Sequence, residues 1–225
     1  MINRNTLLIL AAALAAGLGF YAAQRHADPA DGFGQTGADV QTPMASPNPL
    51  SARMQTVHLF GEPRVLPPFR LTAADGSAIT NASLQGHWSL LFLGFTRCPD
   101  VCPTTLQDLA VAQKTWSDLP PKIAPRILFV SVDPGHDTPQ KVGEFARYFS
   151  PKIVAATADL PMLQSFAKSL GMVFMKVPTS GGDYSIDHSA SVSLIDPQGR
   201  MAGLIQPPLV AARIGADMRV LAMSR

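Results

Sequence analysis

The chain has 225 residues, of which 47% are hydrophobic, so it is long and apolar enough to bury the core of one domain. Its 18 basic and 16 acidic side chains are nearly balanced, and without Arg4 and Arg25 near the N-terminus the remainder is formally neutral. Nucleic acid or another polyanionic surface is therefore not expected as a partner.

An uncharged, apolar run occupies residues 6–23. Its 18 residues match the length of a helix that spans a bilayer. A cleaved signal peptide is the alternative, because Ala22 and Ala23 supply the small residues of a cleavage site, but the apolar part of such a peptide is usually shorter. We expect residues 1–25 to be a retained transmembrane helix, with the rest of the chain outside the cytoplasm.

Residues 26–55 are rich in Ala, Gly, Pro, Asp and Ser and contain few large apolar residues. Such a composition provides little apolar surface to bury and predicts a flexible tether. Residues 56–225 are then the single folded domain. Near its start, short segments at 69–71 and 77–80 flank an Asp-Gly turn, which predicts a hairpin.

The two cysteines of the chain, Cys98 and Cys102, follow a run of apolar residues at 88–95. That run is typical of a central strand covered on both faces, and Gly94 near its end allows another part of the chain to come close. A proline after each cysteine disfavours helical backbone, so we expect a loop there and a helix that begins at Pro103. Because the N-terminus of a helix favours thiolate, the pKa of both thiols is expected to be lowered.

The rest of the domain alternates between strand and helix patterns. Thr138 followed by Pro139 predicts a helix start. The other predicted elements are strands at 126–132, 153–156 and 174–177, helices at 161–170 and 208–223, and a hairpin of 192–195 with 201–205. This order predicts an α/β fold with a mixed sheet and an extra hairpin. A cysteine loop between the first core strand and its helix is where a thioredoxin-like fold carries its chemistry.

The spacing of the cysteines, with three residues between them, fits neither a four-ligand zinc site nor the usual redox motif with two intervening residues. An inert disulfide is one interpretation, since an exported domain meets oxidising conditions. A reactive pair is the other, because a helix start activates thiols. In the second case the pair exchanges disulfides or binds a soft metal.

Histidines are the residues that would complete a metal site with the two thiolates. Three are expected to be solvated or structural: His26, His58 and His87. His136 follows the second buried strand, at the sheet edge where the cysteine loop opens. His188 shortly precedes the apolar strand at 192–195, and a lone histidine there is ordinarily structural. Two thiolates and one imidazole, however, form a ligand set that suits copper(I) and tolerates copper(II).

Three stretches of the sequence are similar to motifs of the Sco/SenC family of copper-binding proteins, which are implicated in assembling the copper site of cytochrome c oxidase. They are GFTRCPDVCPTTL at 94–106, SVDPGHDTP at 131–139 and DHSASVSLIDPQGR at 187–200. The resemblance covers residues 69–205 or so. It implies a thioredoxin-like fold and copper ligands at Cys98, Cys102 and His188.

The resemblance also places Asp133 and Asp187 on motif positions, and a carboxylate at 187 would orient the ring of His188. The sequence departs from the family pattern at Gly135 and His136, where many members have an acidic and a basic residue. His136 is therefore an additional candidate ligand.

The first functional hypothesis is a metallochaperone that binds one copper ion, as copper(I) or copper(II). It would deliver the ion to subunit II of cytochrome c oxidase, with another periplasmic copper chaperone as donor. We then expect a single-pass protein of the bacterial inner membrane whose domain lies in the periplasm.

The second hypothesis is a thiol–disulfide reductase in which Cys98 and Cys102 keep the cysteines of that copper site reduced. A metallochaperone is not an enzyme, so catalysis is expected only under this second hypothesis. The lack of a proline in residues 185–193, where a thioredoxin-like fold guides disulfide substrates, weakens it. A peroxidase of related fold is a third hypothesis, because Thr96, two residues before Cys98, resembles a threonine of that peroxidase family.

Overall fold

The computed structural model describes residues 49–224. The predicted anchor at 1–25 and most of the predicted tether at 26–55 lie outside these residues. In the described part of the chain, no helix is both long enough and apolar enough to cross a membrane. The first described element is a short 3-10 helix at Ser51–Arg53.

The strand β4 (Ser89–Gly94) lies in the middle of an eight-stranded sheet, and all its residues are buried. On one side it pairs in parallel with β5 (Arg126–Ser131), which pairs in parallel with β6 (Ile153–Thr157). On the other side it pairs antiparallel with β9 (Val192–Ile195). The sheet is therefore mixed, and the prediction of a central strand covered on both faces is confirmed.

Two hairpins extend the sheet on either side of this centre. Strand β10 (Arg200–Ile205) pairs antiparallel with β9, and β2 (Arg70–Ala73) pairs antiparallel with β3 (Ala78–Thr80). Both hairpins are predicted by their turn residues. Strand β2 also pairs with β6, so the full order is β1-β10-β9-β4-β5-β6-β2-β3. A second 3-10 helix, Asn81–Leu84, follows β3.

The sequence does not predict the edge strand β1 (Val57–Val65). Its pairing with β10 shifts register between Leu59 and Arg64. Gly61 and Pro63 fall in that interval and disturb the alternation of apolar residues. An edge strand with a bulge tolerates both, because Pro63 has no N–H that would need a partner in the ladder.

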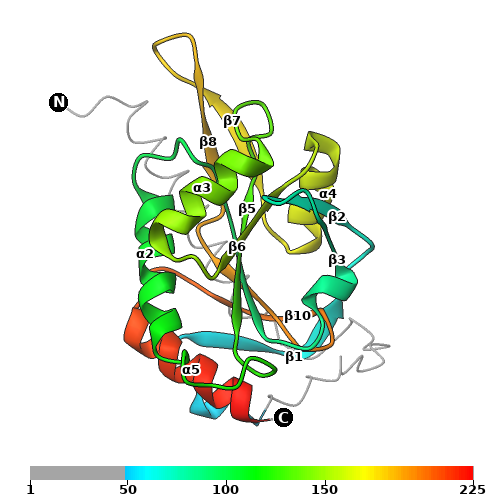
Figure 1. Cartoon of the computed structure of the whole chain (residues 1–225), viewed down its shortest axis with the longest axis vertical. Coiled ribbons are helices and arrows are strands. Elements are labelled where there is room, and N and C mark those ends of the chain that lie inside the picture. The colour runs from blue at the N-terminus through cyan, green and yellow to red at the C-terminus, as the bar shows by residue number, and fades with distance from the viewer. Residues whose placement is uncertain (1–48, 225) are drawn as a thin grey trace, which may run out of the picture. The chain divides into compact units, whose positions relative to one another are not determined.

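Four α-helices of the described residues pack on the sheet and on one another: α2 (Val101–Lys114), α3 (Pro139–Phe149), α4 (Leu160–Ser169) and α5 (Ala211–Met223). Helix α3 packs against β5 and β6, and α2 packs against α3 and α5 (Figure 1). The predicted start of α3 is confirmed, since the Thr138 hydroxyl accepts a hydrogen bond from the Lys141 N–H at 3.3 Å.

The predicted start of α2 is wrong, because the helix begins at Val101, and Cys102 lies in its first turn. Pro103 is then the third helical residue. The first N–H groups of a helix have no partner within it, so a proline costs no hydrogen bond at that position. The preference of Cys102 for extended backbone before a proline is overridden by the rest of the helix.

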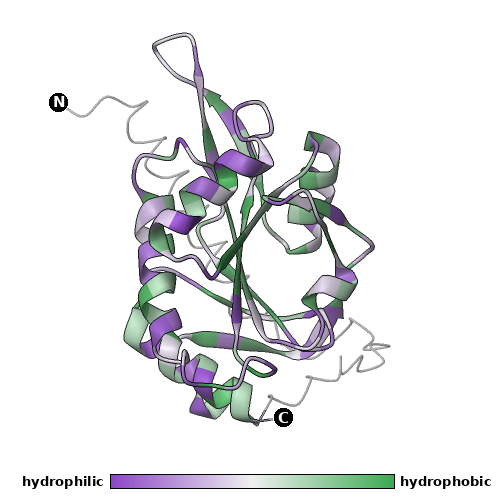
Figure 2. Cartoon of the chain, viewed as in Figure 1, coloured by the Kyte–Doolittle hydropathy of each residue, from purple (hydrophilic) through white to green (hydrophobic). Residues whose placement is uncertain are grey.

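The core of the domain lies around β4 and its neighbours, whose ribbons are mainly green in Figure 2. Phe92 and Phe129 stack across β4 and β5 with their ring centroids 6.1 Å apart. Leu106 and Leu109 of α2 are fully buried against this layer. Burial of side chains of this size contributes roughly 1.5–3 kcal/mol each, which makes the end of β4 a rigid base for the residues that follow it.

Two further strands form a separate two-stranded sheet, β7 (Phe174–Pro178) with β8 (Tyr184–His188). In Figure 1 this hairpin projects beyond the large sheet. The sequence predicts β7 but not β8, which is short and contains only one large aliphatic residue, Ile186. From its end the chain runs directly into β9.

The buried carboxylate of Asp217 on α5 holds the start of the folded domain. It accepts hydrogen bonds from the N–H groups of Gln55, Thr56 and Val57 at 2.8–3.0 Å, and its residue is only 1% exposed. Hydrogen bonds to a charged group stabilise more than those between neutral groups. The last helix therefore fixes the point at which the chain enters β1.

We predict that Asp217→Ala lowers the free energy of unfolding by about 3 kcal/mol, because it leaves several buried N–H groups without an acceptor. Urea denaturation of residues 26–225, followed by circular dichroism, measures the change. Asp118→Ala is the matched control. Asp118 is an exposed ion-pair partner of Arg219, which lies on the same helix as Asp217, and loss of this exposed pair should change the stability little. Equal stability of the two variants would contradict the assignment.

Candidate metal centre

The loop after β4 carries Cys98, which is 9% exposed. The loop is anchored by the buried residue Asp137. The Asp137 carboxylate accepts hydrogen bonds from the Thr96 N–H at 2.9 Å and from the Thr96 hydroxyl. The hydroxyl of Ser131, at the end of β5, donates to the same carboxylate. The Thr96 hydroxyl, on which the peroxidase hypothesis rests, thus donates its proton to Asp137 and helps to hold the loop.

The two sulfur atoms meet at the start of α2. The Cys102 N–H donates a hydrogen bond to Sγ of Cys98 at 3.4 Å, and the side chain of Asp100 at the N-cap makes no capping bond. The Cys98 sulfur thus accepts a hydrogen bond from one of the first N–H groups of the helix, which have no partner within the helix. Both cysteines are free thiols, so an inert disulfide is not what the structure contains.

His188 reaches this pair from the end of β8. Its Nε2 lies 3.3 Å from Sγ of Cys102, and its Nδ1 lies 3.1 Å from the carbonyl oxygen of Ser189. A carbonyl can only accept, so Nδ1 carries the proton and Nε2 presents its lone pair to the sulfur. The rings of Phe92 and Phe95 form T-shaped pairs with the imidazole, with centroids 5.8 and 6.1 Å from that of the imidazole.

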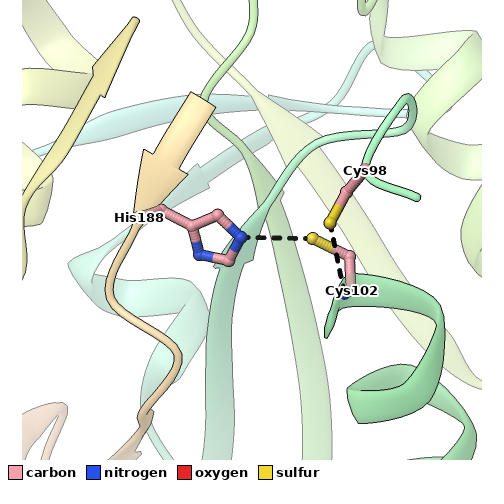
Figure 3. A group of neighbouring side chains, drawn as sticks. All are labelled: Cys98, Cys102 and His188. Carbon is pink, nitrogen blue, oxygen red and sulfur yellow. Dashed lines mark hydrogen bonds between the residues drawn. The ribbon is translucent and has the colours of Figure 1, made fainter. Parts of the chain in front are cut away.

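Cys98, Cys102 and His188 each offer one ligand atom, and these three atoms lie within 4.8 Å of one another (Figure 3). Within residues 49–224 this is the one such group of three or more His, Cys, Asp or Glu side chains. Two sulfurs and one imidazole nitrogen fit the soft ion copper(I). The family resemblance implied the same three residues as ligands. The fold brings them together from the loop after β4, the start of α2 and the end of β8.

Burial controls the ionisation of two of these groups. It raises the pKa of the Cys102 thiol well above its ordinary value, and the hydrogen bond with Cys98 raises it further. The predicted lowering is wrong for this residue, because loss of water around the sulfur outweighs the helix dipole. Burial lowers the pKa of His188, which favours the neutral imidazole that a metal requires. A bound cation would displace the thiol proton.

Gly94, the last residue of β4, makes room for the buried thiol. A Cβ atom at this position would lie 2.8 Å from Sγ of Cys102 and 2.9 Å from the ring of Phe129. No ordinary side chain fits such a gap. The close approach expected of Gly94 is thus to the sulfur of Cys102.

The other candidate residues lie outside the three-ligand group. Asp187 is exposed on the outer side of β8, and the contact expected to orient His188 comes from the Ser189 carbonyl instead. Asp133 is fully buried and binds the hydroxyl of Tyr184, while Nδ1 of His136 lies 3.0 Å from the same carboxylate. His136 therefore belongs to a neighbouring polar cluster.

Sequence reasoning missed two residues that organise this region, Asp137 and Tyr184. Asp137 lies inside the stretch SVDPGHDTP, which was singled out for Asp133 and His136. Tyr184 stands four residues before His188, and in a strand such a pair shares one face. That second signal needed β8 to be recognised as a strand.

Comparison with known proteins gives consistent matches over this domain. The sequence profile of the SCO1/SenC family matches residues 59–222. The mitochondrial SCO1 homolog 1 of Arabidopsis thaliana is 38% identical over 132 residues, which are 58% of this chain and 39% of that protein. The chain thus spans less than half the length of this relative.

Solved structures match the fold as well. The structure of ScoI from Bradyrhizobium japonicum with copper bound has a TM-score of 0.64 and 32% identity, covering 70% of this chain and 99% of that one. Yeast Sco1 with copper bound has a TM-score of 0.62 and 30% identity, covering 70% and 87%. The predicted mixed α/β architecture is therefore that of Sco proteins. Together with the family profile over residues 59–222, these matches show that the chain belongs to the SCO1/SenC family.

Proposed function

We propose that this protein is a copper metallochaperone that binds one copper ion through Cys98, Cys102 and His188. The observation that carries the proposal is the approach of these three ligand atoms to within 4.8 Å of one another. Copper is the cargo. The recipient would be the copper site of cytochrome c oxidase subunit II during assembly, with another periplasmic copper chaperone as donor.

The geometry of the group supports transfer rather than permanent storage. A set of three ligands leaves room around the ion, so an incoming thiolate can bind before any original ligand leaves. His188 is only partly buried, and it comes from a hairpin outside the large sheet. Membership of the SCO1/SenC family, and the copper-bound structures of two relatives, agree with this cargo.

A thiol–disulfide reductase is the second candidate, because both cysteines are free and their sulfur atoms lie near each other. In this reaction one thiolate attacks a partner disulfide, and the other thiolate then releases the partner as a dithiol. The two electrons and two protons move from this chain to the partner, and Cys98 and Cys102 end as a disulfide. Complete burial of Cys102 favours a small ion over a bulky disulfide.

We predict that His188→Ala separates the two candidates, since it removes the nitrogen ligand and touches neither sulfur. Copper(II) affinity should fall at least about 100-fold, and copper(I) affinity should fall less because the softer ion depends mainly on sulfur. Reduction of a model disulfide should change little. Competition titrations with chelators of known affinity measure the first two quantities.

The same variant is then expressed in cells that lack the native protein, and oxidase activity is measured. His58→Ala is the matched control, because His58 is an exposed histidine on the edge strand β1. The metallochaperone predicts loss of oxidase activity for His188→Ala alone. Full oxidase activity with copper binding abolished would leave the reductase as the better account.

We predict that copper(I) binds only to the reduced protein, because a disulfide between Cys98 and Cys102 consumes both sulfur ligands. The chain is oxidised with a small-molecule disulfide, titrated with copper(I) and examined by native mass spectrometry beside the reduced chain. One copper ion per reduced chain and none per oxidised chain is the expected result. Equal loading of both forms would show that the sulfurs are not the ligands.

We also propose that residues 1–25 anchor the protein in the inner membrane, with the domain in the periplasm. The apolar run at 6–23 and the polar, proline-rich segment after it support this topology. N-terminal sequencing of the protein purified from membranes should find the chain uncleaved. A mature N-terminus near residue 24, in a protein recovered without detergent, would contradict the anchor.

A further inference from the structure

The hairpin that carries His188 has no strand pairing with the large sheet. Strands β7 and β8 pair only with each other in the described part of the chain. Tyr184, Ile186 and His188 alternate along β8 and therefore share one face. Ile186, in the middle, is 4% exposed and is buried in the core. The position of His188 thus depends on side-chain contacts at several points of this face.

Tyr184 supplies the contact at the far end of β8 from His188. Its hydroxyl donates a hydrogen bond to Oδ1 of Asp133 at 2.5 Å and lies 2.7 Å from Nδ1 of His136. Asp133 is fully buried in the loop after β5, so its carboxylate is a fixed acceptor. Burial and this hydrogen bond raise the pKa of Tyr184, and the hydroxyl therefore keeps the proton that it donates.

The same contact reaches the cysteine loop through Arg97, the residue before Cys98. The Arg97 guanidinium forms an ion pair with Asp183, lies 3.6 Å from the carboxylate of Asp133 and stands 5.3 Å from the centre of the Tyr184 ring. The Nζ atom of Lys176 lies 3.9 Å from the same centre. The hairpin, the loop after β5 and the cysteine loop are thereby joined at Tyr184.

The loop after β5 is shaped to receive the hydroxyl. A Cβ atom at Gly135 would lie 3.0 Å from the Tyr184 oxygen, so a side chain there would crowd it. The absence of a side chain at 135 lets the hydroxyl reach Asp133. The contact therefore depends on a residue choice in the loop as well as on the tyrosine.

We propose that Tyr184 is a positioning residue for the metal centre, which holds the β7–β8 hairpin so that Nε2 of His188 stands beside Sγ of Cys102. The predicted change in copper affinity rests on the proposed function. The predicted change in the position of His188 does not. Because copper(II) depends on the imidazole more than copper(I) does, Tyr184 also sets the relative affinity for the two ions.

We predict that Tyr184→Phe, which deletes only the hydroxyl, displaces His188 and lowers copper(II) affinity about tenfold or more, with a smaller loss for copper(I). The full chain is used throughout. The absorption bands of its copper(II) complex should shift, because the His188 imidazole no longer coordinates the ion in the same position. Tyr148→Phe is the matched control, because Tyr148 is 86% exposed on α3 and should leave every readout unchanged.

A measurement on the copper-free chain tests the positioning separately. The nuclear Overhauser effect between the rings of His188 and Phe95, assigned with His188→Ala, should weaken in Tyr184→Phe while circular dichroism stays the same. An unchanged ring contact overturns the proposal, and so does a lost contact with unchanged copper(II) affinity. If the wild-type chain binds no copper, the proposed function fails, and the ring contact alone decides whether Tyr184 positions His188.

Discussion

The contact between Cys102 and His188 joins two residues that are 86 positions apart in the sequence. Cys102 lies in helix α2, and His188 lies in a hairpin that is not paired with the large sheet. Three nearby features help to keep these elements in place. Asp137 fixes the loop before α2, Gly94 leaves space for the sulfur, and the Ser189 carbonyl turns the imidazole so that its lone pair faces the thiol. Cys98, Cys102 and His188 come together because the sheet, helix α2 and the separate hairpin are held in fixed relative positions.

Burial gives this site its chemical character. Burial disfavours the charged forms of two of these groups, because it raises the pKa of the Cys102 thiol and lowers the pKa of the His188 imidazole. A cation changes that balance, since it stabilises the thiolate that burial disfavours.

Local patterns in the sequence predicted much of this architecture. The strand β4, the two hairpins of the large sheet and the capped start of α3 follow from apolar runs and turn residues. The three residues of the candidate metal centre follow from motif resemblance. Other features depend on contacts between distant segments. The edge position of β1 allows Pro63 to lie within a strand, and the helix as a whole overrides the local preference of Cys102, so that α2 begins at Val101. Only the complete fold shows how deeply Cys102 is buried. The role of Tyr184 depends on a strand whose residues give little local signal.

The hydrogen bonds between Asp217 and the start of β1 also determine how a pulling force on the N-terminal side is transmitted to the domain. In Figure 1, β1 and α5 lie at one end of the described chain and the β7–β8 hairpin at the other. A pull on the residues before Gln55 is transmitted first to α5, through the hydrogen bonds of a single carboxylate. The β7–β8 hairpin, which carries His188, lies at the opposite end of the described residues, so such a force does not act on it directly.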